Sequence, residues 1–170
     1  MKQIRADVFE TNSSSTHAIC ISNKKPDLPT YPVRFGHGEF GWAQETFCDV
    51  YDRAAYLNEA IDCFDDAEEY RDKLKSILDK YHITYEFEPR HLFDSIDHGY
   101  ETKEFIDAVF SDEQLLLRYL FSDDSFIVTG NDNDGQDLIN EILYNGNDPW
   151  EDGVELDPKY KDFDIYWKGN

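Results

Sequence analysis

The spacing of apolar residues along the chain predicts several amphipathic helices. One stripe recurs at steps of three or four residues, as expected for one face of a helix, and consists of Phe47, Val50, Ala54, Leu57, Ile61 and Phe64. It predicts a long helix from about Trp42 to Phe64. The same spacing predicts helices over residues 66–81, 102–110, 113–121 and 136–144. The sequence "SDEQ" at 111–114 fits a capping box that opens the fourth of these helices.

Alternation of apolar and polar residues predicts short strands between these helices. Strands are expected over residues 82–88, 125–130 and 163–167, and "YPVRF" at 31–35 is expected to be extended. Residues 2–9 and 16–22 read as a hairpin with a turn near 12–15. No repeat or linker divides the chain. The pattern therefore predicts one α+β domain over residues 1–170, with a small, mainly antiparallel sheet packed against several amphipathic helices.

The charge of the chain indicates which kinds of partner the protein can bind. The 170 residues include 37 acidic and 16 basic side chains, which gives a formal net charge of −21. Such a field repels nucleic acid and anionic membrane surfaces, so direct binding to either is not expected. It attracts basic surfaces, including the grooves of proteins that bind nucleic acid. The competing interpretation is that the acidic residues only confer solubility.

The cysteines and the N-terminal sequence predict where the protein acts. Cys20, Cys48 and Cys63 are odd in number and lack CxxC spacing, so they are expected to be buried or free thiols in a reducing cytoplasm. The first ten residues, "MKQIRADVFE", contain no hydrophobic signal core, and no apolar run approaches membrane-spanning length. We therefore expect the protein to act in the cytoplasm of the cell that makes it.

Acidic residues concentrate on the predicted solvent side of the long helices and in a late loop. Carboxylates three or four residues apart on a helix lie close together and form a row that is coarsely like the phosphates of a nucleic-acid strand. Trp150 within the loop is a candidate aromatic anchor for a basic partner. The predicted partner-binding residues are Asp49, Asp52, Glu59, Asp62, Asp65, Asp66, Glu69, Asp148, Trp150, Glu151 and Asp152.

The stretch "FETNSSSTHAI" at residues 9–19 is unusually polar for a segment between apolar residues. Serine, threonine and asparagine side chains bond local backbone in turns, which suffices to explain the run. The alternative is a catalytic site in which a serine is activated by a histidine, with Ser14, His17 and His98 as candidates. No GxSxG motif surrounds the serines, so a nucleophile elbow is not indicated.

Other motifs indicate ligands less well, and no cofactor is predicted. Gly36, Gly38 and Gly41 match G-x-G-x-x-G, but Glu39 would face the phosphates and no βαβ unit follows. The loop "GNDNDG" places Asp132, Asp134 and Glu141 at calcium-ligand positions, although Gly130 occupies the first position. A turn explains this loop equally. A further group of histidines and carboxylates in one short stretch could meet a metal: His91, Asp94, Asp97 and His98.

Four short motifs resemble a loose group of phage and mobile-element proteins that have no assigned activity. They are "VFETNSSSTHAICI", "GEFGW", "IDHG" and "GNDNDG". The resemblance implies a phage setting but no mechanism. If the motifs meet in the fold, their polar residues would form a shared pocket, which is composed of Glu10, Asn12, Ser13, Ser14, Ser15, His17, Glu39, Trp42, His98, Asn131 and Asp132.

In charge and size, though not in sequence, the chain is similar to phage inhibitors of bacterial defence. These include DNA mimics that occupy restriction or CRISPR nucleases. The leading hypothesis is a non-enzymatic, acidic anti-defence protein that binds the basic nucleic-acid-binding surface of a host nuclease. The alternative hypothesis is a small hydrolase or transferase that acts on a nucleotide or nucleic-acid signal, with its site around residues 10–17 and His98. A structural virion protein is a third possibility.

Overall fold

A four-stranded antiparallel sheet with the strand order β4-β7-β1-β8 organises the molecule. This computed structural model describes residues 15–41, 43–89, 95–131, 137–149 and 151–169. The strands are β1 (Ser15–Ile21), β4 (Glu45–Phe47), β7 (Phe126–Asn131) and β8 (Asp164–Lys168). Both edges of β1 pair with described strands, β7 on one side and β8 on the other. The predicted first strand of the N-terminal hairpin lies outside the described residues.

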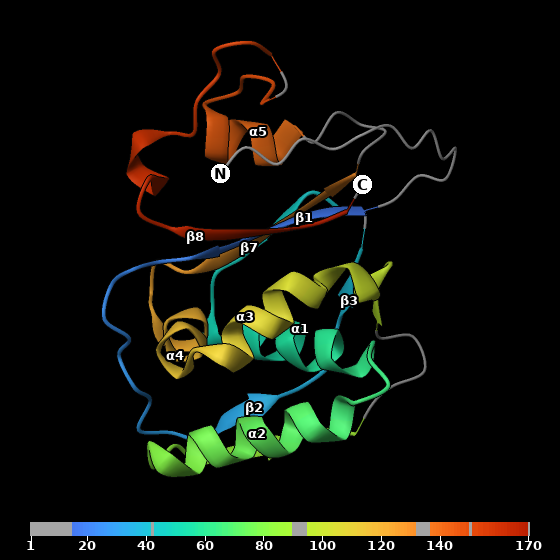
Figure 1. Cartoon of the computed structure of the whole chain (residues 1–170), viewed down its shortest axis with the longest axis vertical. Helices are drawn as coiled ribbons and strands as arrows, with labels where there is room; N and C mark the ends of the chain where they lie inside the picture. Colours follow the sequence, from blue (N-terminus) through green and yellow to red (C-terminus); the bar gives the residue numbers. More distant parts are fainter. Residues whose placement is uncertain (1–14, 42, 90–94, 132–136, 150, 170) are drawn as a thin grey trace.

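The two faces of this sheet are covered by different helices, because side chains alternate along each strand. Ile19 and Ile21 of β1 belong to the larger core, whereas Ala18 and Cys20 pack in a smaller cluster with Ile139. In Figure 1, α5 (Asp137–Tyr144) lies on one side of the sheet, and α1 (Val50–Asp62), α3 (Lys103–Ser111) and α4 (Glu113–Phe121) lie on the other. The predicted α+β fold with a mainly antiparallel sheet is confirmed.

Two short parallel strand pairs extend the structure away from this sheet. β2 (Val33–Phe35) pairs with β5 (Tyr85–Phe87), and β3 (Glu39–Phe40) pairs with β6 (Ser95–Ile96). In Figure 1, β2 lies between α1 and α2 (Ala67–Lys80), which forms the outermost layer. Two short 3₁₀ turns, Gly99–Thr102 and Pro158–Tyr160, complete the elements.

The predicted long helix begins later than expected. Asp49 caps α1, because its side chain accepts a hydrogen bond of 2.9 Å from the backbone N–H of Asp52. Residues 45–47 instead form β4, in which Thr46 lies opposite Val128 of β7. Phe47 lies three residues before Val50, which fits helical spacing, but Phe47 belongs to β4 and Val50 is the first residue of α1. The prediction of a helix from Trp42 was therefore wrong over its first two turns, and Trp42 itself lies outside the described residues.

The N-cap of α4 lies one residue later than a capping box at Ser111 would place it. The Asp112 side chain accepts hydrogen bonds from the backbone N–H groups of Gln114 and Leu115, at 2.9 and 3.3 Å. Ser111 instead donates its hydroxyl to the carbonyl of Ala108 in the last turn of α3. A capped helix start is therefore present where the sequence predicted one, with aspartate as the capping residue.

Candidate functional site

A buried polar contact joins the two ends of the described chain. The Lys168 Nζ donates hydrogen bonds to the hydroxyl and to the carbonyl of Ser15, at 2.6 and 2.7 Å. Both residues are 0% exposed. The backbone N–H of Ser15 donates to Asp97 Oδ2 at 3.1 Å. A hydroxyl, an amine and a carboxylate therefore meet at the start of β1.

His17 lies on the same face of β1 and is also completely buried. Its Nε2 lies 3.3 Å from the carbonyl of Gly41, which can only accept a hydrogen bond, so Nε2 carries the hydrogen. Nδ1 therefore accepts from the hydroxyl of Tyr56, at 2.9 Å. Burial, reinforced by the charge of Lys168, lowers the pKa of His17 to about 3. The imidazole is thus neutral and fully engaged, and it positions its neighbours rather than acting as a base toward Ser15.

A hollow of about 470 Å³ opens beside this cluster. Its lining includes Gly41, which accepts from His17, and Asp97, which accepts from Ser15. The short β3–β6 pair supplies the rest of its wall, because Glu39, Phe40 and Ser95 line it as well. The hollow therefore has room for a small polar molecule beside Asp97, whereas Ser15 itself is not among the lining residues.

His98, the other candidate of the catalytic hypothesis, lies close to the same group through Asp97. His98 adopts a left-handed backbone conformation with φ of 50°, and its ring stacks on Tyr100 with centroids 5.9 Å apart. Its Nε2 lies 3.8 Å from Asp97 Oδ1. Ser14, the proposed nucleophile, lies outside the described residues.

The polar residues of the four motifs converge in part. Asn131 lies opposite Ser15 in the register of β1 and β7, and Glu39 lines the hollow beside Asp97. The remaining motif residues, Glu10, Asn12, Ser13, Trp42 and Asp132, lie outside the described residues, as do His91 and Asp94. Sequence reasoning missed Lys168, which stands 153 residues from Ser15 and looks like an ordinary residue at the end of a strand.

Two of the predicted partner-binding carboxylates on α1 do not lie on a solvent face. Glu59 is 0% exposed, and the side chain of Asp62 is 10% exposed and paired with Arg71. The placement on the solvent side was wrong because α1 is covered all round: every residue from Arg53 to Ile61 is buried. In Figure 1 this helix lies between the sheet and the β2–α2 layer.

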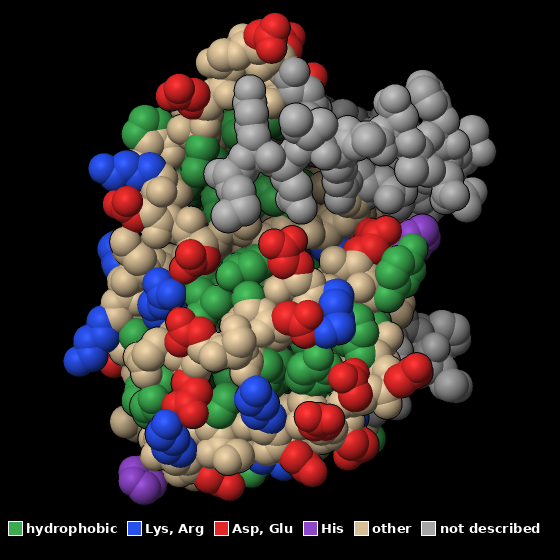
Figure 2. Space-filling view, in the orientation of Figure 1, with side chains coloured by type: hydrophobic (Ala, Val, Ile, Leu, Met, Phe, Trp, Pro, Cys, Tyr) green, Lys and Arg blue, Asp and Glu red, His purple; other side chains and the backbone are tan. Residues whose placement is uncertain are grey.

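The other predicted carboxylates that the structure describes are more accessible. Asp65, Asp66 and Glu69 are exposed where α1 passes into α2, and none of the three has an ion pair with a described residue. Asp49 is exposed but caps α1, and the pKa of Asp52 is raised by partial burial and by the neighbouring Asp49 carboxylate. Figure 2 shows acidic side chains along the α2 edge, with basic side chains among them.

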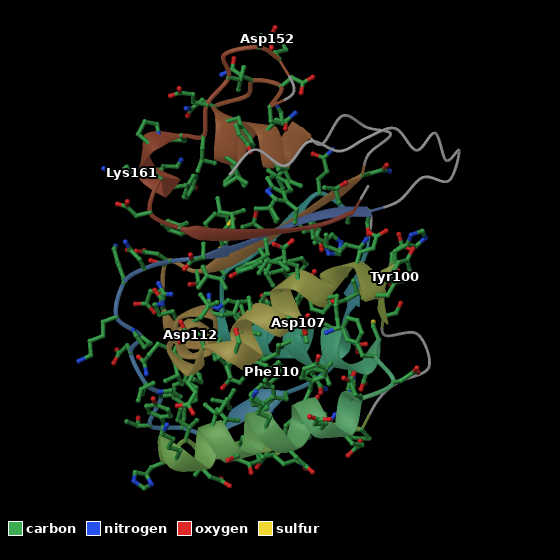
Figure 3. The ribbon with its side chains drawn as sticks, in the orientation of Figure 1. Tyr100, Asp107, Phe110, Asp112, Asp152 and Lys161 are labelled. Atoms are coloured by element: carbon green, nitrogen blue, oxygen red, sulfur yellow. The ribbon has the colours of Figure 1, made fainter. Side chains whose placement is uncertain are left out.

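A second exposed acidic group lies at the opposite end of the molecule. Asp148, Glu151 and Asp152 are exposed in the loop after α5, and Figure 3 shows Asp152 at the far end from α2. Trp150, the predicted anchor in this loop, lies outside the described residues. The two acidic groups are therefore separate surfaces.

The predicted calcium loop lies mostly outside the described residues, so it stays a prediction. Asp132 and Asp134 lie outside the described residues, and Glu141 is exposed on α5. The glycine-rich stretch at 36–41 contains β3, and the next described element is β4, so no helix follows the stretch directly. Cys20, Cys48 and Cys63 are free thiols. Within the described ranges, one group of side chains has the spacing of a metal site, and it consists of His37, Glu59 and Asp62.

Comparisons with known proteins found no relative of this chain. No family model, curated protein or solved structure matches the chain. In the part of the chain that the structure describes, no helix combines the length and apolar character needed to cross a bilayer.

Proposed function

We propose that the protein is a phage-encoded anti-defence protein that binds the basic nucleic-acid-binding surface of a host defence nuclease in the host cytoplasm. The observation that carries the proposal is the division of charge between surface and interior. Arg53 and Lys168, two of only 16 basic residues, are completely buried and add nothing to the surface that a partner meets. Among the described residues Glu59 is the one completely buried acidic side chain, so burial removes more positive than negative charge from a surface that belongs to a chain of net charge −21.

Such a surface binds by replacing phosphates with carboxylates. A nuclease groove lined with lysine and arginine carries bound anions, and a partner that supplies fixed negative charge releases them. The same charges repel nucleic acid, so the protein would not bind nucleic acid itself. It would instead compete with nucleic acid for the groove of the nuclease. Affinity of this kind falls steeply as salt rises.

The acidic corner that best suits this role is Asp65, Asp66 and Glu69 at the α1–α2 junction. These side chains are exposed and have no described ion-pair partner, so they are not already neutralised by the protein's own lysines and arginines. Nearby carboxylates are less available, because Glu68 pairs with Arg71 and Asp72 with Lys75. We call these three residues the acidic corner.

A pull-down from a lysate that contains defence nucleases tests the proposal. We expect the protein to retain a nucleic-acid-binding protein at low salt and to release it at high salt. Neutralising the acidic corner by Asp65→Asn, Asp66→Asn and Glu69→Gln should weaken retention and inhibition of the nuclease. A matched control that removes the same charge elsewhere, Asp27→Asn with Glu141→Gln and Asp162→Asn, should retain most binding. The proposal would be contradicted if the amount of nuclease retained changed neither with salt nor with neutralisation of the acidic corner.

A second candidate function rests on the contact between Ser15 and Lys168. An amine at hydrogen-bond distance from a serine hydroxyl is the arrangement of Ser–Lys nucleophile–base pairs. The hollow of about 470 Å³ meets this pair through Asp97, which accepts from the backbone N–H of Ser15, although Ser15 and Lys168 are themselves 0% exposed. This geometry favours a small hydrolase or transferase acting on a nucleotide or nucleic-acid signal, with Ser15 in the role that the sequence suggested for Ser14.

Stoichiometry and two substitutions separate the candidates. A binding protein should inhibit its target only near one-to-one ratio, whereas an enzyme should act at far lower ratios. Ser15→Ala should abolish an enzymatic effect while thermal unfolding remains near that of the wild type, and Lys168→Met should do the same if it still folds. If Ser15→Ala only lowers thermal stability and the folded fraction still inhibits, the contact is structural.

A further inference from the structure

A separate polar cluster lies on the side of α1 that faces β2 and α2. Glu59 and Asp62 are three residues apart on α1 and therefore share a face of the helix. His37 reaches them from the segment that follows β2. One donor atom from each of the three side chains lies within 4.8 Å of the other two. Small movements of these side chains would bring the three atoms to the distances of ligands around one ion.

The hydrogen bonds of His37 turn one ring nitrogen toward the carboxylates. Nε2 lies 3.1 Å from the carbonyl of Glu88, which can only accept, and 3.3 Å from Nδ2 of Asn58, which can only donate. The shorter of these two contacts is satisfied by a hydrogen on Nε2. Nδ1 then faces Glu59 Oε1 at 2.5 Å with its lone pair. Two lone pairs this close require a positive charge between them, either a proton or a metal ion. A histidine whose other nitrogen donates to a backbone carbonyl is the usual form of a metal-ligating histidine.

Burial makes this pair costly unless a cation satisfies it. The side chains of His37 and Glu59 are 4% and 0% exposed. A buried carboxylate is stable only when it is paired, hydrogen-bonded or bound to a metal. The cluster is therefore not an ordinary solvated acidic surface.

Asn58 supplies an independent sign of a missing ligand. It is 1% exposed, and its Oδ1 has no hydrogen-bond partner, although its Nδ2 donates to the carbonyl of Gly36 at 3.0 Å. Asn58 lines a hollow of about 260 Å³ together with His37 and Asp62. Buried amide oxygens are almost always hydrogen-bonded or bound to an ion. An amide oxygen is also an oxygen ligand for a cation.

The charges around the hollow favour a cation. Glu68 and Glu88 line it in addition to Asp62, and Arg71 is the one basic side chain among its lining residues. Arg71 pairs with Asp62 and Glu68, so part of the negative charge around the hollow is already balanced by this one basic side chain. Of the inner pair of His37 and Glu59, His37 lines the hollow, and Glu59 lies behind it.

We propose that His37, Glu59 and Asp62 bind one divalent transition-metal ion of the Zn²⁺ type. Imidazole favours zinc and its neighbours over Mg²⁺ and Ca²⁺, which prefer oxygen ligands alone. Zinc bonds to nitrogen and oxygen at about 2.0–2.2 Å, so the ion would widen the 2.5 Å gap between Nδ1 and Oε1. Asn58 Oδ1 or water would complete the coordination. Because the ion ties α1 to the segment after β2, its first effect would be on stability.

Metal titration of the purified, chelator-treated protein tests this site. Zn²⁺ binding is measured by calorimetry, and Co²⁺ is used as a spectroscopic probe of coordination. We expect one equivalent to bind in the wild type and to raise the unfolding temperature. His37→Gln and Asp62→Asn should each weaken Zn²⁺ binding at least tenfold and remove the Co²⁺ absorption of the site. Asp62 lies near the rim, so Asp62→Asn remains informative if His37→Gln does not fold.

Control variants distinguish this site from the general attraction of an acidic protein for cations. Glu69→Gln and Asp72→Asn remove exposed carboxylates of α2 and should leave the bound equivalent unchanged. Equal losses in control and ligand variants would overturn the proposal, as would wild-type affinity in Asp62→Asn. Failure of the wild type to bind Zn²⁺ would instead identify the cluster as a proton-bridged ion pair. None of these outcomes depends on the anti-defence proposal.

Discussion

Arg53 is a positive charge in the interior of a strongly acidic chain. It is 1% exposed, and its guanidinium donates to three backbone carbonyls: Leu120 at 2.8 Å, Ser125 at 2.5 Å, and Cys48. The carbonyl of Leu120 lies in the last turn of α4, where a cation is favourable. Burial lowers the pKa of Arg53 from its usual value, but these acceptors keep the charge satisfied. One side chain thereby joins α1, the end of α4 and the start of β7.

Replacing Arg53 should therefore destabilise the protein strongly. Arg53→Met leaves three carbonyls without their donor, and the loss of one partner from a buried charged network costs about 3–5 kcal/mol. Urea denaturation followed by circular dichroism measures this loss. The matched control is Arg34→Met, because that side chain is 63% exposed and its pairing with Glu86 is loose, at 3.9 Å. The control should change the free energy of unfolding by less than about 0.5 kcal/mol. Equal losses in both variants would contradict the anchoring role of Arg53.

At the scale of single residues, the sequence did not reveal which charges are buried. Glu59 has the helical spacing of a solvent-facing carboxylate, and its partner His37 lies 22 residues away in a segment without regular structure. Lys168 and Ser15 are separated by almost the whole chain. Such pairs arise from tertiary packing, so neither local spacing nor charge could predict them.

At the scale of elements, the sequence predicted best where apolar residues repeat over several turns. α2, α3 and α4 begin and end within one residue of the predicted bounds, because each places a continuous stripe against the core. Errors occur where a pattern is too short to define a period. β3 and β6 have two residues each and were not predicted, although they build the wall of the larger hollow. β4 was absorbed into the predicted long helix for the same reason.

At the scale of the whole molecule, two groups of exposed carboxylates lie far apart, and further acidic and basic side chains are spread between them (Figure 2). The acidic corner and the loop of Asp148, Glu151 and Asp152 lie at opposite ends. Self-repulsion among so many carboxylates destabilises a compact state, so this surface is costly unless a basic partner uses it. The two polar clusters, at Ser15–Lys168 and at His37–Glu59, lie on different sides of α1 and are independent of that surface.

Competition with nucleic acid shows whether the protein covers the nucleic-acid-binding surface of its target nuclease. The nuclease captured in the pull-down is loaded with a labelled DNA or RNA duplex, and fluorescence anisotropy follows the label as the protein is added. We expect full displacement of the duplex at low salt, and we expect the Asp65→Asn, Asp66→Asn, Glu69→Gln variant to require a higher protein concentration for the same displacement. A stable complex in which nuclease, duplex and protein are bound together would contradict the claim that the protein covers the nucleic-acid-binding surface.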